Sequence, residues 1–143
     1  MKAFNVDSLP PSRKVKFHAG VSNRMLLASD GMGYTMTKTV IEPGVRAFQH
    51  YKHHLETCYC VSGRAILEDA KTGQFWSIYP GMCYVLDGND PHYFEALETT
   101  VLICVFNPPL VGSETHRADG SYAPALDSIG EALQGSSLAA TGY

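Results

Sequence analysis

The sequence predicts an all-β fold, a single small barrel, and three observations support this. Turn signals recur roughly every eight to twelve residues, the spacing typical of β-sandwiches and barrels. The segments between the turns are rich in β-branched and aromatic residues, which favour strands. No long amphipathic helical pattern interrupts the series. A parallel α/β sheet, which needs a helix between successive strands, is therefore not expected.

The strands are expected in the following order. They cover residues 23–28, 34–41, 45–51, 56–61, 64–69, 74–78, 83–86, 92–96 and 100–106. Turn residues separate them at 30–33, 42–44, 62–63, 71–73, 80–81 and 87–91. The Asn-Pro-Pro sequence at 107–109 ends the last strand, because proline has no amide hydrogen to donate to a sheet. Residues 113–124 then read as an ordered loop, and Asp127 begins one or two helical turns near the C-terminus.

Length and composition predict one domain. The chain has 143 residues, of which 45% are hydrophobic and 17% charged, a globular mixture. We expect a barrel domain with an N-terminal arm over residues 1–125 and a partly flexible tail over 126–143. The net charge of -3 gives no basic surface for nucleic acid or an anionic membrane.

The sequence also indicates the cellular compartment. No apolar segment approaches the roughly 20 residues that span a bilayer, and the first residues show no signal-peptide core. The four cysteines match no Cys-x-x-Cys zinc pair and each lies in an apolar, strand-like segment, so we expect buried, reduced thiols. These observations together predict a cytoplasmic protein.

Three of the six histidines lie within the sequence QHYKHHLE at 49–56. Strand alternation, if no turn interrupts it, divides these residues between two faces. The inner face would carry His50, Lys52, His54 and Glu56, and the outer face Tyr51, His53 and Leu55. A glutamate inside a small barrel is costly unless it is paired or bound to a metal.

The same region matches the first sequence pattern of the cupin barrels through Gly44, His50, Glu56 and Gly63, with Lys52 at the usual second histidine. The second cupin pattern follows with Pro80 and Gly81, but Tyr84 stands where a histidine is usual. Two usual ligands are therefore missing, and one reading is a barrel without metal. The other is a rebuilt set of Glu56, Tyr84 and His92, which suits iron and leaves positions open for a substrate.

Four segments resemble the ectoine synthase family. They are RMLLASDGMGYTMTKT (24–39), HYKHHLETCYCVSG (50–63), YPGMCYVLDGNDPHY (79–93) and CVFNPPLVGSETH (104–116). The resemblance implies a single-domain cupin barrel of the jelly-roll type. It also implies a hydro-lyase that requires iron, most simply Fe²⁺ although another divalent metal would fit. The implied reaction closes N-γ-acetyl-L-2,4-diaminobutyrate into ectoine, a compatible solute, with loss of water.

The resemblance assigns site residues as well. It implies that Glu56, Tyr84 and His92 hold the metal. The implied catalytic residues are Glu114, His116, Tyr51 and His54, and the implied substrate-binding residues are Arg24, Thr39, Cys104 and Phe106. A small-molecule substrate and a homodimer are the implied partners, with no nucleic acid or membrane.

One departure from the family pattern leaves alternatives open. The family has a tryptophan four residues before the position of Arg24, where this chain has Gly20, and Thr37 replaces an asparagine or histidine. Loss of an aromatic wall would enlarge the pocket. The alternatives are a related cupin lyase or cyclic-amidine hydrolase with a bulkier substrate, and a non-catalytic cupin that binds a small metabolite.

Overall fold

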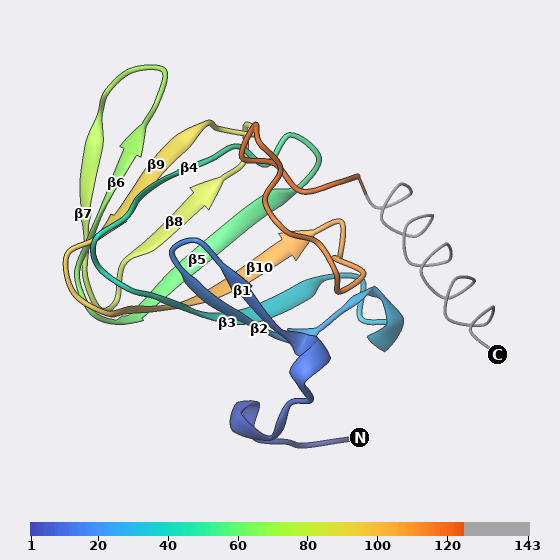
Figure 1. Cartoon of the computed structure of the whole chain (residues 1–143). Helices are drawn as coiled ribbons and strands as arrows, with labels where there is room; N and C mark the ends of the chain where they lie inside the picture. Colours follow the sequence, from blue (N-terminus) through green and yellow to red (C-terminus); the bar gives the residue numbers. More distant parts are fainter. Residues whose placement is uncertain (125–143) are drawn as a thin grey trace, which may run out of the picture.

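The computed structural model describes residues 1–124, which form ten strands in two antiparallel sheets that face each other (Figure 1). The six-stranded sheet has the order β1-β2-β3-β10-β5-β8. Its strands are β1 (Lys14–Phe17), β2 (Gly20–Leu26), β3 (Thr35–Ile41), β10 (Thr100–Asn107), β5 (Leu55–Ser62) and β8 (Cys83–Leu86). The four-stranded sheet has the order β4-β9-β6-β7. Its strands are β4 (Arg46–Gln49), β9 (His92–Ala96), β6 (Ala65–Asp69) and β7 (Phe75–Ile78). The predicted all-β fold is confirmed.

All nine predicted strands are present, and the structure adds β1. Its sequence, KVKF, is too short and too charged to stand out as a strand. It forms a hairpin with β2 in which Phe17 pairs with Gly20. The described helical structure consists of three short 3₁₀ turns, η1 (Val6–Ser8), η2 (Pro11–Arg13) and η3 (Ala28–Asp30). The helical turns predicted from Asp127, and the predicted tail over 126–143, lie outside the described residues.

The core lies between the sheets, where strand alternation directs every second side chain inward. In β3 the alternation is strict, and Thr35, Thr37, Thr39 and Ile41 are buried. Apolar side chains from both sheets fill the rest of the interior, among them Ile78, Phe94 and Leu102. Within residues 1–124, no helix is long and apolar enough to cross a membrane.

Gly63 of the first cupin pattern occupies a position that only glycine fits. Its φ angle is 91°, a backbone conformation that L side chains rarely adopt. A Cβ atom there would lie 2.3 Å from the carbonyl oxygen of Thr99 and 2.5 Å from Cα of Thr100. The glycine therefore allows the turn after β5 to pack against the start of β10.

The predicted division of residues 50–56 between two faces is partly wrong, because the chain turns between β4 and β5. β4 ends at Gln49 and β5 begins at Leu55, so the alternation does not continue through the turn. Tyr51, expected outside, is buried inside the barrel together with His54 and Glu56. Lys52, expected inside, is exposed, and its Nζ pairs with Asp119 at 2.9 Å.

The segment after β10, residues 108–124, lies across one end of the barrel (orange to red in Figure 1). Backbone hydrogen bonds hold this segment at both ends. The amide of Ala28 donates to the carbonyl oxygen of Leu110 at 2.8 Å, and the amide of His50 donates to the carbonyl oxygen of Gly120 at 2.9 Å. Tyr122, near the end of the segment, is buried. This path places the side chains of Glu114, His116 and Tyr122 over the barrel interior.

Candidate functional site

A small cavity of about 20 Å³ lies between the sheets at the end covered by residues 108–124. This volume is enough for about one water molecule. The polar groups around it come from Ser22, Thr39, Gln49, Tyr51, Glu56, Tyr84, Cys104, His116 and Tyr122, and the apolar ones from Phe17, Ile41, Leu102 and Phe106. Five of the residues predicted for the site, Thr39, Tyr51, Cys104, Phe106 and His116, therefore line one cavity together with Glu56 and Tyr84, whereas Arg24, His54, His92 and Glu114 do not.

Glu56 of β5 projects into this cavity as a buried carboxyl group. It accepts a hydrogen bond from Sγ of Cys58 at 3.2 Å. Across residues 1–124, no Lys, Arg or His side chain forms an ion pair with it. Burial raises its pKa to about 7, although hydrogen bonds from Cys58 and Cys104 lower it in part. A buried carboxylate without a cationic partner is costly, and a bound metal ion would remove that cost.

Tyr84 of β8 lies opposite Cys58 in the strand register and lines the same cavity. Burial raises the pKa of its phenol well above the usual value, and the nearby Cys58 and Glu56 raise it further. The hydroxyl is therefore protonated unless a cation stabilises the phenolate.

His92 of β9 is buried and lies opposite Gln49 in the register. Its Nδ1 lies 2.9 Å from the carbonyl oxygen of Asp90, which can only accept, so Nδ1 carries the proton. Its Nε2 then holds the lone pair. It lies 3.1 Å from Oε1 of Gln49, which also only accepts, so in this tautomer the two atoms do not hydrogen-bond to each other and the lone pair can bind a cation. Metal-binding histidines typically have this arrangement, in which the second nitrogen donates to a carbonyl. The donors of Glu56, Tyr84 and His92 thus have the chemistry expected for a metal site.

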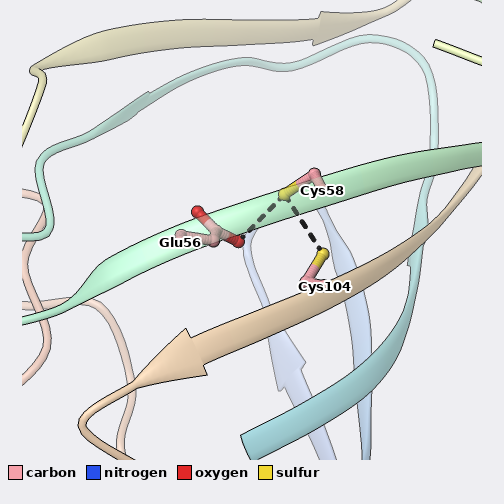
Figure 2. A group of neighbouring side chains, drawn as sticks. All are labelled: Glu56, Cys58 and Cys104. Atoms are coloured by element: carbon pink, nitrogen blue, oxygen red, sulfur yellow. Dashed lines mark hydrogen bonds between the residues drawn. The ribbon is translucent and has the colours of Figure 1, made fainter. Parts of the chain in front are cut away.

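A second possible metal site shares Glu56. Three possible ligand atoms lie within 4.8 Å of one another: a carboxylate oxygen of Glu56 and the Sγ atoms of Cys58 and Cys104 (Figure 2). The prediction did not include Cys58, although strand alternation from Glu56 already places it on the inner face. The expected burial of the cysteines is confirmed for Cys58, Cys60 and Cys104, and wrong for Cys83, which is exposed on edge strand β8.

Tyr51 and His116 form a hydrogen-bonded pair at the cavity, with the Tyr51 hydroxyl 2.8 Å from Nε2 of His116. The Tyr122 ring stacks on His116 with centroids 4.8 Å apart and lies 4.9 Å from the Tyr51 ring. Burial, followed by the charges of His18 and Arg24, lowers the pKa of His116 to about 4, so its imidazole is neutral near pH 7. Its Nδ1 is buried and has no hydrogen-bond partner among residues 1–124.

Arg24 and Glu114, both predicted to act on the substrate, form a buried ion pair with each other at 3.3 Å. The Glu114 carboxylate also accepts from the amides of Val111 at 2.5 Å and Gly112 at 2.8 Å. Arg24 donates to the carbonyl oxygens of Gly112 and Glu114. Neither side chain lines the cavity. In this arrangement the pair anchors the segment that carries His116.

His54, also predicted to be catalytic, is buried beside the cavity wall. Its ring packs edge-on against Phe106, with centroids 6.4 Å apart, and against Tyr122 at 6.2 Å. Neither ring nitrogen has a hydrogen-bond partner among the described residues. Burial lowers its pKa, which favours the neutral imidazole.

A larger cleft of about 350 Å³ opens beside the cavity, between β8 and the β6–β7 hairpin. Its walls include Tyr84, His92, Trp76 and Met82. Because Tyr84 lines both spaces, its side chain lies between the open cleft and the closed cavity.

Comparison with known proteins identifies the family. The family model described as Ectoine synthase matches residues 4–126. The chain belongs to the ectoine synthase family. The L-ectoine synthase of Desulfatibacillum aliphaticivorans is 44% identical over 85% of this chain and 94% of its own length. The L-ectoine synthase of Halomonas elongata is 46% identical over 73% of this chain and 76% of its own length.

Solved structures agree with the ectoine synthase assignment. The crystal structure of ectoine synthase from P. lautus superposes with a TM-score of 0.75 and 35% identity, covering 79% of this chain and 82% of that one. A Cupin_2 domain of a transcriptional regulator from Enterobacter cloacae has a TM-score of 0.53 at 16% identity over 64% of this chain and 99% of its own, which shows the cupin fold alone. The predicted family and fold are thus confirmed, and the named relatives indicate an enzyme.

In this member of the ectoine synthase family, Gly20 does not leave an enlarged pocket. A Cβ atom on Gly20 would lie 1.9 Å from the carbonyl oxygen of Val40, so the backbone of β3 occupies the space where a side chain would begin. Phe17, at the other end of the hairpin turn, lines the cavity, and its ring centroid lies 5.6 Å from that of His116. The absence of a side chain at Gly20 therefore gives no structural reason to expect a bulkier substrate.

Proposed function

We propose that this chain is an ectoine synthase, a hydro-lyase that cyclises N-γ-acetyl-L-2,4-diaminobutyrate to ectoine with loss of water. The observation that carries the proposal is the enclosed polar cavity, in which a buried, unpaired carboxyl group lies beside a Tyr–His pair, in a chain of this family. The reaction needs an activated amide carbonyl, a proton acceptor for the amine and a proton donor for the departing hydroxyl.

Iron is the cofactor that we propose, held by Glu56, Tyr84 and His92. The set of one carboxylate, one phenolate and one imidazole is rich in hard donors, which suits iron better than a thiophilic metal. When bound, iron supplies Lewis acidity, which polarises the acetamide carbonyl of the substrate.

Tyr51 and His116 are proposed to move the protons. Burial raises the pKa of Tyr51 well above the usual value, so its hydroxyl is protonated and able to donate. The unpartnered Nδ1 of His116 can accept a proton from the substrate ammonium while Nε2 passes its own to Tyr51, which protonates the leaving hydroxyl. A concerted transfer avoids a stable imidazolium, which the low pKa of His116 disfavours.

Arg24 and Glu114 are proposed to act mainly by positioning. Their buried pair fixes residues 111–114, and thereby the neighbouring His116. Arg24 keeps Nε without a partner among residues 1–124, so binding of the substrate carboxylate remains a prediction for this side chain. Thr39, Cys104 and Phe106, which line the cavity, are proposed to contact the substrate.

Substrate binding requires movement at the covered end of the barrel. The cavity of about 20 Å³ is smaller than the substrate, and the ring of Tyr122 fills the space beside His116 and Phe106. We propose that residues 113–124 shift to admit the substrate and then exclude water from the reaction.

We also propose a cytoplasmic homodimer. The outer face of β5 exposes Leu55, Tyr59 and Val61, and Val85 of β8 continues this apolar strip. A contiguous exposed apolar surface favours a protein interface. The free thiols of all four cysteines suit a reducing compartment.

The proposed function is tested by incubating iron-loaded protein with the acetylated diamino acid and detecting ectoine by proton NMR. Glu56→Gln, which keeps the size of the side chain but removes its charge, is the matched control. We expect ring formation with the wild-type protein and neither iron retention nor ring formation with the variant. Absence of product from folded, iron-loaded wild-type protein would refute the proposal.

A further inference from the structure

Two cysteines from different strands meet beside Glu56. Cys58 of β5 and Cys104 of β10 are direct partners in the antiparallel register, and their side chains point into the barrel. Their Sγ atoms are 3.5 Å apart, and Sγ of Cys58 lies 3.2 Å from Oε1 of Glu56. Figure 2 shows the three side chains turned toward one another from the two strands.

These separations are close to those of a tetrahedral metal site. With bonds of about 2.3 Å to sulfur and about 2.0 Å to oxygen, tetrahedral ligands are separated by roughly 3.5–3.8 Å. The two distances from Cys58, 3.5 and 3.2 Å, lie within a few tenths of an ångström of these values, and the ligand atoms of Glu56 and Cys104 lie within 4.8 Å of each other. The cluster comes from neighbouring positions of two paired strands, so the sheet itself holds the ligands in place.

The surroundings leave space for a fourth ligand. Glu56 and Cys104 line the cavity of about 20 Å³, which is large enough for a water molecule. Tyr84 lines the same cavity and lies opposite Cys58 in the register, so its hydroxyl is a second possible fourth ligand. Cys60 is the next inward-facing cysteine of β5. Its thiol donates to the carbonyl oxygen of Ser62 and so does not join the cluster of Glu56, Cys58 and Cys104.

We propose that Glu56, Cys58 and Cys104 form a binding site for a thiophilic divalent cation, of which Zn²⁺ and Cd²⁺ are examples. A ligand set of two thiolates and one carboxylate favours such thiophilic ions, whereas iron is better suited to the oxygen and nitrogen donors of Glu56, Tyr84 and His92. Because the site uses the carboxylate that we assign to iron, the two ions exclude each other. The proposal concerns binding and holds whether or not the chain forms ectoine.

The first test uses the full-length chain with its cysteines reduced and its metals removed. Cys83 is replaced by Ser in every protein, because it is the exposed thiol. Cd²⁺ is titrated while the cadmium–thiolate charge-transfer absorption is recorded, and cadmium NMR then reports the ligand type. We expect one tightly bound Cd²⁺ per chain, with a chemical shift typical of two sulfur ligands. A shift typical of oxygen and nitrogen ligands alone would overturn the proposal, and this measurement needs no substitution in the cluster.

Variants then separate this cluster from the predicted iron ligands. Cys58→Val, which is similar in size and apolar, is expected to abolish the charge-transfer band. Loss of a residue that only hydrogen-bonds to a metal ligand typically weakens binding by roughly 10–100-fold. Because Cys58 is proposed to be a ligand itself, Cys58→Val should weaken Cd²⁺ binding by more than this. The matched controls are Cys60→Ala, which removes a buried thiol from the same strand, and His92→Asn, which removes a predicted iron ligand. Both should retain the band. Retention of the band in Cys58→Val, or its loss in both controls, would contradict the proposed site.

Discussion

The hydroxyl of Tyr51 lies 2.8 Å from Nε2 of His116, although 65 residues separate them in the chain. The turn between β4 and β5 carries Tyr51 inward, and the segment across the barrel end brings His116 to it. This pair connects the cavity that contains Glu56 with the segment that covers it. Its position supports a role in proton transfer.

Tyr51→Phe removes the proton donor but keeps the ring. We expect kcat to fall by roughly 100- to 10,000-fold, the usual contribution of general acid–base catalysis, while KM changes little. Steady-state kinetics on iron-loaded protein measures both constants. Tyr59→Phe, which alters an exposed tyrosine on the outer face of β5, should keep wild-type rates. An equal loss in both variants, or an unchanged kcat in Tyr51→Phe, would exclude this role.

Glu114→Gln leaves the buried Arg24 guanidinium without a charged partner. Removal of one member of a buried ion pair typically costs about 3–5 kcal/mol, so the free energy of unfolding should fall by that amount. Urea unfolding followed by circular dichroism measures the change. Lys52→Met, which breaks the exposed pair with Asp119, should change the free energy of unfolding far less, because solvent screens an exposed pair. If the two variants prove equally stable, Glu114 does not anchor the segment.

Protonation of His116 should lower stability in acid, whereas Glu56, whose pKa is raised to about 7, makes a contribution of opposite sign over much of the same pH range. The pKa of His116 in the folded protein is about 4, against about 6.5 in an unfolded chain, because burial disfavours the charged imidazole. At His116 the unfolded state therefore binds more protons between these values, which lowers the free energy of unfolding as the pH drops from about 6.5 to 4. Compared with the wild type, His116→Gln should show a more favourable change in Tm between about pH 7 and pH 5, because the variant lacks this protonation. His54, whose pKa is also lowered, contributes in the same direction as His116 in both proteins. An identical change of Tm with pH in His116→Gln and the wild type would contradict the assignment.

Gly63→Ala should destabilise the fold more than Gly73→Ala. Both glycines have positive φ angles, 91° and 72°, so alanine introduces backbone strain of order 1–3 kcal/mol at each. At Gly63 the added Cβ would also meet Thr99 and Thr100, whereas nothing lies within 4 Å of it at Gly73. Thermal unfolding of the two variants measures the difference. Equal Tm values would show that the contact with β10 is relieved without cost.

The strands could be predicted from the sequence because their signal is local. Most of the nine predicted strands alternate or are rich in β-branched and aromatic residues, and glycine or proline lies in most of the turns between them. The signal fails where it is short, as in β1, and where a turn resets the alternation, as between Gln49 and Leu55. Cys58 could have been placed beside Glu56 by the same alternation, two residues further along the strand.

The arrangement of the site depends on contacts that no local pattern contains. The pairing of Arg24 with Glu114 joins residues 90 positions apart, and no local pattern predicts that these two side chains bind each other. The approach of Val40 to Gly20 likewise depends on the register of β2 with β3. The lack of a side chain at Gly20 therefore does not produce a larger cavity, because the backbone of Val40 already fills the space.

We propose that one iron ion is bound inside the barrel by Glu56, Tyr84 and His92. Anomalous X-ray scattering at the iron absorption edge, recorded from crystals of the iron-loaded protein, locates the ion directly. We expect a single strong peak within bonding distance of all three side chains. A peak elsewhere in the barrel, or none in protein shown by elemental analysis to contain iron, would contradict it.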